Sequence, residues 1–173
     1  GLSITAIAAA TRRPPQVAGM HFSNPVPVMK RLEIVKGLYT SEETIRIVRE
    51  VGARIGKDSQ LTKKDYPGLT GNRMLSLFIN EAFNEVDQGI ASAEDVDAAA
   101  RLGLGHKMGP LETADLIGLD VVLDISEHLY RELGPRFIPS PLLKKLVEAG
   151  DLGRKSGKGV YDYRGGEKKT WLF

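Results

Sequence analysis

Residues 17–35 read VAGMHFSNPVPVMKRLEIV, and this stretch sets the architecture of the first third of the chain. Two short apolar runs, 17–22 and 32–35, are separated by a Pro-rich loop over residues 25–30. Short apolar runs that are bounded by proline or other turn residues are typical of buried strands. The stretch therefore predicts two strands joined by a loop.

Helical patterns flank these two strands. Residues 4–11 are rich in alanine and predict a short helix, and Thr40 with Glu43 forms a capping box for a second helix. That second helix has an apolar face made of Ile45, Val48, Val51 and Ile55. Residues 60–62 predict a last strand, and the segment 63–68, which contains Pro-Gly, predicts a hinge.

Beyond Tyr66 the pattern is helical throughout. A long helix is predicted over residues 72–88, with an apolar stripe of Leu75, Phe78, Ile79, Ala82, Phe83 and Val86. Ser92 with Asp95 caps the next helix, and further helices are predicted to follow Pro110, Asp120 and Pro141. The sequence therefore predicts an α/β segment, a boundary near Tyr66 and an all-helical second domain.

Composition excludes several classes of function. The 24 basic and 22 acidic residues are scattered and give a net charge of +2, which does not favour nucleic acid as a partner. With no cysteine, a thiolate metal site is impossible and a reducing compartment, the cytoplasm, is favoured. No apolar run approaches the roughly 18 residues that a membrane helix needs, so we expect no membrane association.

Among the three histidines, His21 is the candidate for acid–base chemistry. It ends the first predicted strand, and Glu33 on the next strand could fix its tautomer and stabilise its protonated form. A lone histidine near a strand end is more often a hydrogen-bonded structural residue, so spacing alone leaves both interpretations open. His106 lies in a turn where packing or capping is favoured. The histidines share no metal-binding spacing, so we expect no metal.

The glycine-rich segments do not form a nucleotide site by themselves. Residues 153–159 read GRKSGKG and combine backbone freedom with three cations, but their spacing is not that of a P-loop. A basic surface loop is favoured over an anion contact. A Gly-x-Gly-x-x-Gly motif after a strand is absent from the sequence.

The segment 19–30, GMHFSNPVPVMK, strongly resembles the catalytic signature of the L-3-hydroxyacyl-CoA and 3-hydroxybutyryl-CoA dehydrogenases. The resemblance continues, in the same order, through residues 66–69, 72–73, 93–97, 102–106, 109–112, 118–120, 139–143 and 153–163. It therefore covers essentially the whole chain. One departure is Thr70-Gly71, where the family usually carries apolar residues.

The resemblance implies a site and a reaction. His21 would be the general base that takes the 3-hydroxyl proton while hydride passes to NAD, Glu33 would orient it, and Asn72 would help to position the substrate. Asn24 and Lys155 match family positions near the nicotinamide cofactor. The substrate would be an acyl-CoA thioester in fatty-acid or butanoate metabolism, and the helical domain would form a homodimer.

The resemblance also implies a fold. We expect a mostly α chain: residues 1–65 as the C-terminal piece of a truncated Rossmann-type NAD-binding domain, and residues 66–173 as the all-α dimerisation and substrate domain. Because the glycine loop is missing, we expect the chain to be a fragment that is inactive alone. The alternative is a non-catalytic helical dimerisation or substrate-binding module.

Overall fold

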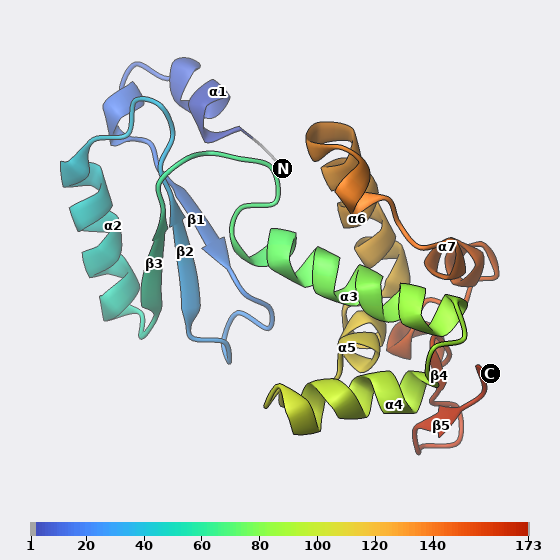
Figure 1. The fold of residues 1–173 in the computed structure, drawn as a ribbon. Helices are drawn as coiled ribbons and strands as arrows, with labels where there is room; N and C mark the ends of the chain where they lie inside the picture. The colour runs from blue at the N-terminus through green and yellow to red at the C-terminus, as the bar shows by residue number, and fades with distance from the viewer. Residues whose placement is uncertain (1–2, 173) are drawn as a thin grey trace. The chain divides into compact units, whose positions relative to one another are not determined.

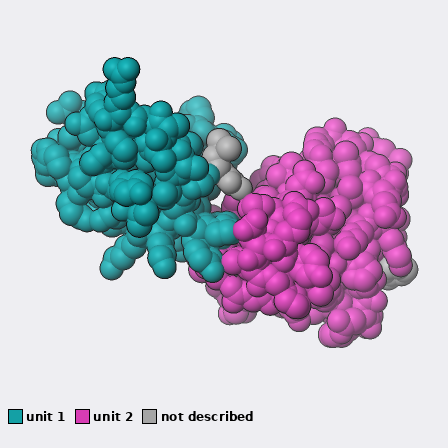
Figure 2. Space-filling model, turned by 90° about the horizontal axis from the view of Figure 1, so that it is seen from above, with its two compact units in different colours: residues 1–70 teal, residues 71–173 magenta. Residues whose placement is uncertain are grey.

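The computed structural model describes residues 3–172 of the chain. These residues fall into two compact units, residues 1–70 and residues 71–173, which Figure 2 shows in different colours. Each unit has its own apolar core and is described in turn.

Unit 1 is a small sheet with helices. Its elements are α1 (Ile4–Ala9), a 3₁₀ turn (Pro14–Gln16), β1 (Gly19–Phe22), β2 (Arg31–Val35), α2 (Glu42–Arg54) and β3 (Asp58–Thr62). The strand order is β1-β2-β3, as Figure 1 shows. β2 is central: it pairs antiparallel with β1 across the Pro-rich loop and parallel with β3 through the crossover helix α2.

The two faces of β2 differ in the side chains that they bury. Because side chains alternate along a strand, Leu32 and Ile34 lie on one face, where they are buried with Ile45 of α2. Glu33 lies on the opposite face and is also buried. The sheet therefore has an apolar face under α2 and a face with a buried carboxylate.

The cap of α2 differs from the prediction. Its N-cap is Ser41, whose hydroxyl accepts from the Thr44 N–H. Thr40 instead donates its hydroxyl proton to the Val17 carbonyl and accepts from the Gly37 N–H. The predicted Thr40 capping box is wrong because this hydroxyl holds the loop that enters α2 against the segment before β1.

The prediction that residues 1–65 are only the C-terminal piece of a domain is also wrong. Residues 1–70 form a compact unit, in which β2 has a hydrogen-bonded neighbour on each side. The crossover helix covers one face of the sheet and closes an apolar cluster with it. The physical reason is that three strands and one helix suffice to enclose the cluster formed by Leu32, Ile34 and Ile45.

Unit 2 contains the predicted helices and a small sheet that the sequence pattern did not predict. Its elements are α3 (Gly71–Asp87), α4 (Ala93–Ala98), a π-helical turn (Ala99–Gly103), α5 (Pro110–Ile117), α6 (Leu119–Leu133), a 3₁₀ turn (Pro135–Phe137), α7 (Pro141–Glu148), a second 3₁₀ turn (Arg154–Ser156), β4 (Tyr161–Asp162) and β5 (Lys169–Thr170). The apolar stripe of α3 is buried through Ile79, Ala82, Phe83 and Val86. The buried face of α3 is therefore the face that its sequence periodicity predicts.

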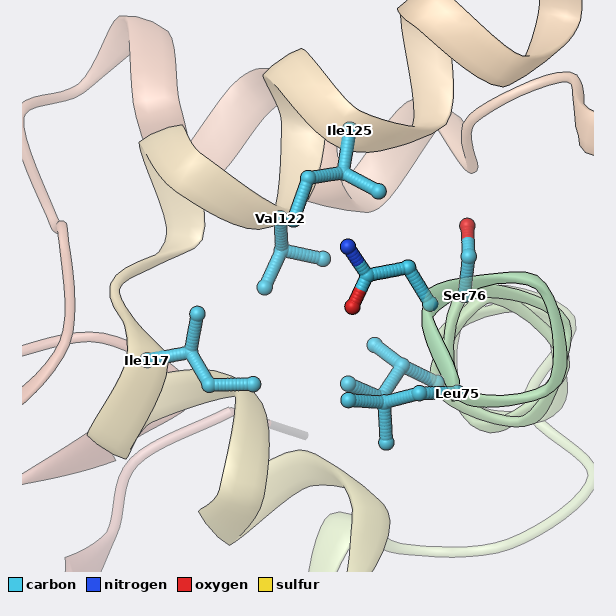
Figure 3. A pocket seen from close by; sticks show the side chains of 7 residues that line it. Leu75, Ser76, Ile117, Val122 and Ile125 are labelled. Carbon is cyan, nitrogen blue, oxygen red and sulfur yellow. The ribbon is translucent and has the colours of Figure 1, made fainter. Parts of the chain in front are cut away.

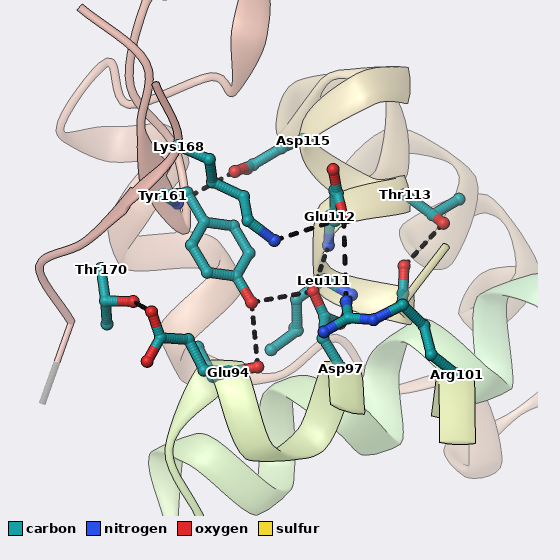
Figure 4. Close-up of polar contacts among 12 residues, drawn as sticks. Glu94, Asp97, Arg101, Leu111, Glu112, Thr113, Asp115, Tyr161, Lys168 and Thr170 are labelled. Atoms are coloured by element: carbon teal, nitrogen blue, oxygen red, sulfur yellow. Dashed lines mark hydrogen bonds and ion pairs between the residues drawn. The ribbon is translucent and has the colours of Figure 1, made fainter. Parts of the chain in front are cut away.

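Two buried carboxylates tie α4, α5 and the C-terminal segment together, and Figure 4 shows the contact of one of them, Asp97, with Tyr161. Asp97 accepts from the backbone N–H groups of Leu111 and Glu112, at 2.8 and 3.0 Å, and from the Tyr161 hydroxyl at 2.8 Å. It therefore caps α5 from a different helix. Gly109 permits this approach, since a Cβ there would lie 2.2 Å from the Asp97 Cγ.

Asp115 anchors the chain after α7. Its carboxylate accepts from the N–H groups of Val160 and Tyr161, at 2.9 and 3.0 Å, and from the Tyr163 hydroxyl at 2.9 Å. Burial raises the pKa of Asp115, and these donors oppose that rise. Burial and the Asp97 carboxylate raise the pKa of Tyr161, so this phenol remains a neutral donor. The C-terminal segment is thus held to α4 through Asp97 and to α5 through Asp115.

Replacing Asp97 by alanine tests this construction. The substitution removes the acceptor of two helix N–H groups and of the Tyr161 hydroxyl, all in a buried site, so we expect the free energy of unfolding to fall by about 2–4 kcal/mol. Urea unfolding followed by circular dichroism measures the change. Asp124→Ala, at an exposed position of α6, is the matched control. Equal stability of the two variants would contradict the capping role.

Candidate active site

His21 and Glu33 form a direct cross-strand pair in unit 1. The antiparallel register of β1 and β2 places the two residues opposite each other, on the same face of the sheet. The His21 Nδ1 lies 3.3 Å from Oε2 of Glu33. The His21 side chain is 41% exposed and that of Glu33 only 1%. An imidazole open to solvent therefore rests on a buried carboxylate.

Four donors surround the Glu33 carboxylate. Its Oε1 accepts from the Thr62 hydroxyl at 2.5 Å and from the Thr70 N–H at 3.0 Å. Its Oε2 accepts from an Arg31 guanidinium N–H at 2.7 Å and faces His21. Both oxygens are thus satisfied, from three strands and the segment that follows β3.

This environment fixes the charge of Glu33. Burial alone would raise its pKa, but the hydrogen bonds from Thr62, Thr70 and His21, together with the Arg31 charge, lower the pKa to about 2. Near neutral pH the group is therefore a carboxylate, which only accepts hydrogen bonds. The His21 Nδ1 must then carry the proton in this contact, which leaves Nε2 as the basic nitrogen.

The two predicted cofactor residues differ in their surroundings. Asn24 is exposed in the loop after β1, three residues beyond His21, and its carboxamide is chemically suited to pair with the carboxamide of a nicotinamide. Lys155 lies in the 3₁₀ turn of unit 2, where its ammonium is 2.5 and 2.6 Å from the two carboxylate oxygens of Asp120. Asn24 is thus exposed, whereas the Lys155 ammonium is already paired with the Asp120 carboxylate.

Asn72 lies in the first turn of α3 and lines a small apolar pocket of unit 2, part of which is labelled in Figure 3. The other lining residues come from α3, α5 and α6: Leu75, Ser76, Ile79, Ile117, Val122 and Ile125. Ser76 and Asn72 supply the polar atoms of this lining.

Sequence reasoning missed three residues that shape the Glu33 site. Arg31 stands two residues before Glu33, so the strand period places both on one face, and this signal was available in the sequence. The place of Thr62 beside Glu33 follows only from the parallel register of β2 and β3, which the sequence pattern does not give. Thr70 acts through its backbone N–H and also places its hydroxyl 3.0 Å from that of Thr62, which no residue pattern predicts.

The remaining features concern His106, metal sites and membrane-spanning helices. The His106 ring packs 4.9 Å from the Phe78 ring, which agrees with the packing role expected for it. Among residues 3–172 no cluster of three or more His, Asp or Glu side chains has the arrangement of a metal site. In the same range, no helix combines the length and apolar character that crossing a bilayer requires.

Family comparisons cover both units. The domain described as "3-hydroxyacyl-CoA dehydrogenase, NAD binding domain" matches residues 1–65, and the one described as "3-hydroxyacyl-CoA dehydrogenase, C-terminal domain" matches residues 68–163. The first match overturns the expectation that residues 1–65 are only the C-terminal piece of a truncated NAD-binding domain. It also confirms NAD as the predicted cofactor.

Individual proteins agree with the family match. The chain is 50% identical to a probable 3-hydroxybutyryl-CoA dehydrogenase of Deinococcus radiodurans, over 94% of the chain and 58% of the relative. It is 51% identical to a probable 3-hydroxybutyryl-CoA dehydrogenase of Bacillus subtilis, over 98% of the chain and 58% of the relative. The chain thus spans a little over half the length of these relatives.

A solved structure shows the same fold. The crystal structure of an (S)-3-hydroxybutyryl-CoA dehydrogenase from Ralstonia eutropha superposes with a TM-score of 0.89 at 45% identity, and covers 94% of the chain and 57% of that protein. The two domain matches, the relatives and this fold point to one assignment. The chain belongs to the 3-hydroxyacyl-CoA dehydrogenase family.

Proposed function

We propose that the protein interconverts an L-3-hydroxyacyl-CoA, such as 3-hydroxybutyryl-CoA, and the corresponding 3-oxoacyl-CoA, with His21 as the general base. The observation that carries the proposal is the half-exposed His21 imidazole seated on the ionised, buried Glu33. Membership of a dehydrogenase family and relatives described as 3-hydroxybutyryl-CoA dehydrogenases support the choice of reaction and substrate.

The His21–Glu33 pair accounts for the proton part of the reaction. Oxidation of a secondary alcohol releases a proton from oxygen and a hydride from carbon, and NAD supplies the hydride acceptor when bound. The His21 Nε2 takes the hydroxyl proton, since Nδ1 already points its proton at Glu33. The buried carboxylate then stabilises the imidazolium. In the reverse direction the same nitrogen returns the proton to the carbonyl oxygen.

The remaining predicted residues have supporting roles in this proposal. Asn72 would orient the 3-oxygen or the thioester of a short acyl group, in agreement with its place in the lining of a mostly apolar pocket. Asn24 would pair with the nicotinamide carboxamide. Lys155 would contact an anionic part of the cofactor after it leaves Asp120.

A second candidate function is a non-catalytic module for dimerisation or substrate binding. Unit 2 favours it in one respect, because this unit is compact and carries its own apolar core. The four-donor environment of Glu33 in unit 1 favours the enzyme, since a passive sheet has no need of a buried carboxylate beneath an exposed histidine.

The His21→Ala substitution tests the base. Acetoacetyl-CoA-dependent oxidation of NADH is measured for the chain and, in parallel, for a version extended to the length of the curated relatives. We expect His21→Ala to lower kcat/KM roughly 100-fold or more in whichever form is active. His128→Ala, in unit 2, is the matched control and should retain activity. Activity that is indifferent to His21 would favour the non-catalytic module.

The Glu33→Gln substitution tests the ionised carboxylate through stability. The pKa of Glu33 is about 2 in the folded protein and lies near 4.5 for an unperturbed group, so its charge contributes stability above pH 4.5 and loses that contribution between pH 4.5 and 2. We expect wild type to exceed Glu33→Gln by about 2–3 kcal/mol at pH 6 and this difference to shrink as pH falls toward 2. Urea unfolding at several pH values measures it. The exposed Glu132→Gln should show no such pH dependence.

Dimerisation through unit 2 is a further prediction. This unit exposes several large apolar side chains, among them Met74, Ile90, Leu102, Leu104 and Leu116. We expect sedimentation equilibrium to give about twice the chain mass of 18.9 kDa. A mass that stays at the monomer value as concentration rises would contradict a homodimer.

A further inference from the structure

We propose that Arg31 is a positioning residue that sets how strongly Glu33 stabilises the proton on His21, and thereby the pH range over which His21 acts. The inference rests on the proposed function, because it concerns the protonation of the same histidine. It goes beyond that function by adding a third member, a permanent cation, to the pair.

The geometry places Arg31 and His21 on the same oxygen. Oε2 of Glu33 accepts from Arg31 at 2.7 Å, whereas the His21 Nδ1 lies at 3.3 Å. The guanidinium is also held from its other side, since its Nε donates to the Gln60 side-chain oxygen at 3.1 Å. The Arg31 side chain is 27% exposed, so its charge is only partly screened by water. Arg31 therefore has the stronger contact with the shared oxygen.

Other charged groups near this face do not replace Arg31. Within residues 3–172, Arg31 and His21 are the cationic groups within ion-pair distance of Glu33. Asp58, opposite Arg31 in register on β3, is exposed, as are Lys63 and Lys64 after that strand. Asp65 is held by the Ser3 hydroxyl and the Thr5 N–H.

The shared oxygen has a consequence for proton transfer. When His21 takes a proton, the new positive charge meets a carboxylate that a guanidinium has already neutralised in part, and it lies near that guanidinium. The imidazolium is therefore less stabilised than it would be by Glu33 alone. With Arg31 present, His21 stays neutral, and so able to act as a base, down to a lower pH. In the reverse direction the protonated imidazole is correspondingly a stronger proton donor.

The first test measures the titration of His21 in the chain itself by NMR of the imidazole Cε1–H, with His21→Ala identifying its signal among the three histidines. Arg31→Gln removes the charge and keeps a donor, and we expect the titration midpoint to rise by about half a pH unit to one pH unit. Arg31→Lys keeps the charge and should leave the midpoint near that of wild type. The proposal is overturned if the Gln variant does not move the midpoint, or if the Lys variant moves it equally.

The second test measures the pH profile of kcat/KM for alcohol oxidation in the active form of the protein. In Arg31→Gln the acid limb should move to higher pH by the same interval as the NMR midpoint, while Arg31→Lys restores it. Gln60→Ala removes the second contact of the guanidinium but keeps its charge, so its acid limb should stay near that of wild type. Should Arg31→Gln fail to fold, Arg31→Met, which also removes the charge, should move the acid limb to higher pH, and an unchanged limb in that variant would overturn the proposal.

The two tests separate this inference from the proposed function. If His21→Ala abolishes turnover but neither Arg31 variant moves the midpoint or the limb, the function stands and the role of Arg31 fails. If turnover is indifferent to His21, the base assignment fails, while the NMR midpoint still decides whether Arg31 controls the protonation of His21.

Discussion

The structure of unit 1 depends on the burial of one carboxylate. Glu33 is almost wholly inaccessible, and a buried charge persists only where donors replace its lost water. Those donors come from its own strand, from both neighbouring strands and from the segment after β3. A one-residue slip of either strand pairing would turn a donor to the other face of the sheet. The ionised state of Glu33 therefore depends on the register of both strand pairs.

Unit 2 uses the same device for a structural purpose. Asp97 and Asp115 are fully buried, and each binds backbone N–H groups and a tyrosine hydroxyl that lie far away in sequence. These contacts tie α4, α5 and the C-terminal segment together without any exposed partner. Glu33 differs from both because one of its donors, His21, is open to solvent, and this difference separates a site able to exchange protons from an anchor.

The sequence predicted the elements well and their polar connections poorly. The apolar periods of residues 45–55 and 75–86 gave helices in the right places, because burial of one face determines them. His21 and Glu33 were paired through strand reasoning and a family resemblance. The pattern predicts Thr40 as a helix cap, which is wrong, and it marks Thr70 only as a residue that differs from the family's usual apolar one. The partners of hydroxyl and backbone groups depend on distances in the folded chain, which a sequence pattern does not give. The hairpin of β4 and β5 was missed since two-residue strands carry no period.

The placement of Arg31 shows that His21 and Glu33 alone do not account for the charges at this site. A His–Glu dyad with a lone carboxylate would hold the imidazolium firmly, which helps proton abstraction but hinders its return. A reaction that runs in both directions requires a base whose two protonation states are close in free energy. In our proposal, a cation on the shared oxygen moves the balance toward the neutral imidazole without removing the carboxylate that fixes its tautomer. The proposal thereby assigns orientation and basicity to different residues, Glu33 and Arg31, which lie on the same face of one strand.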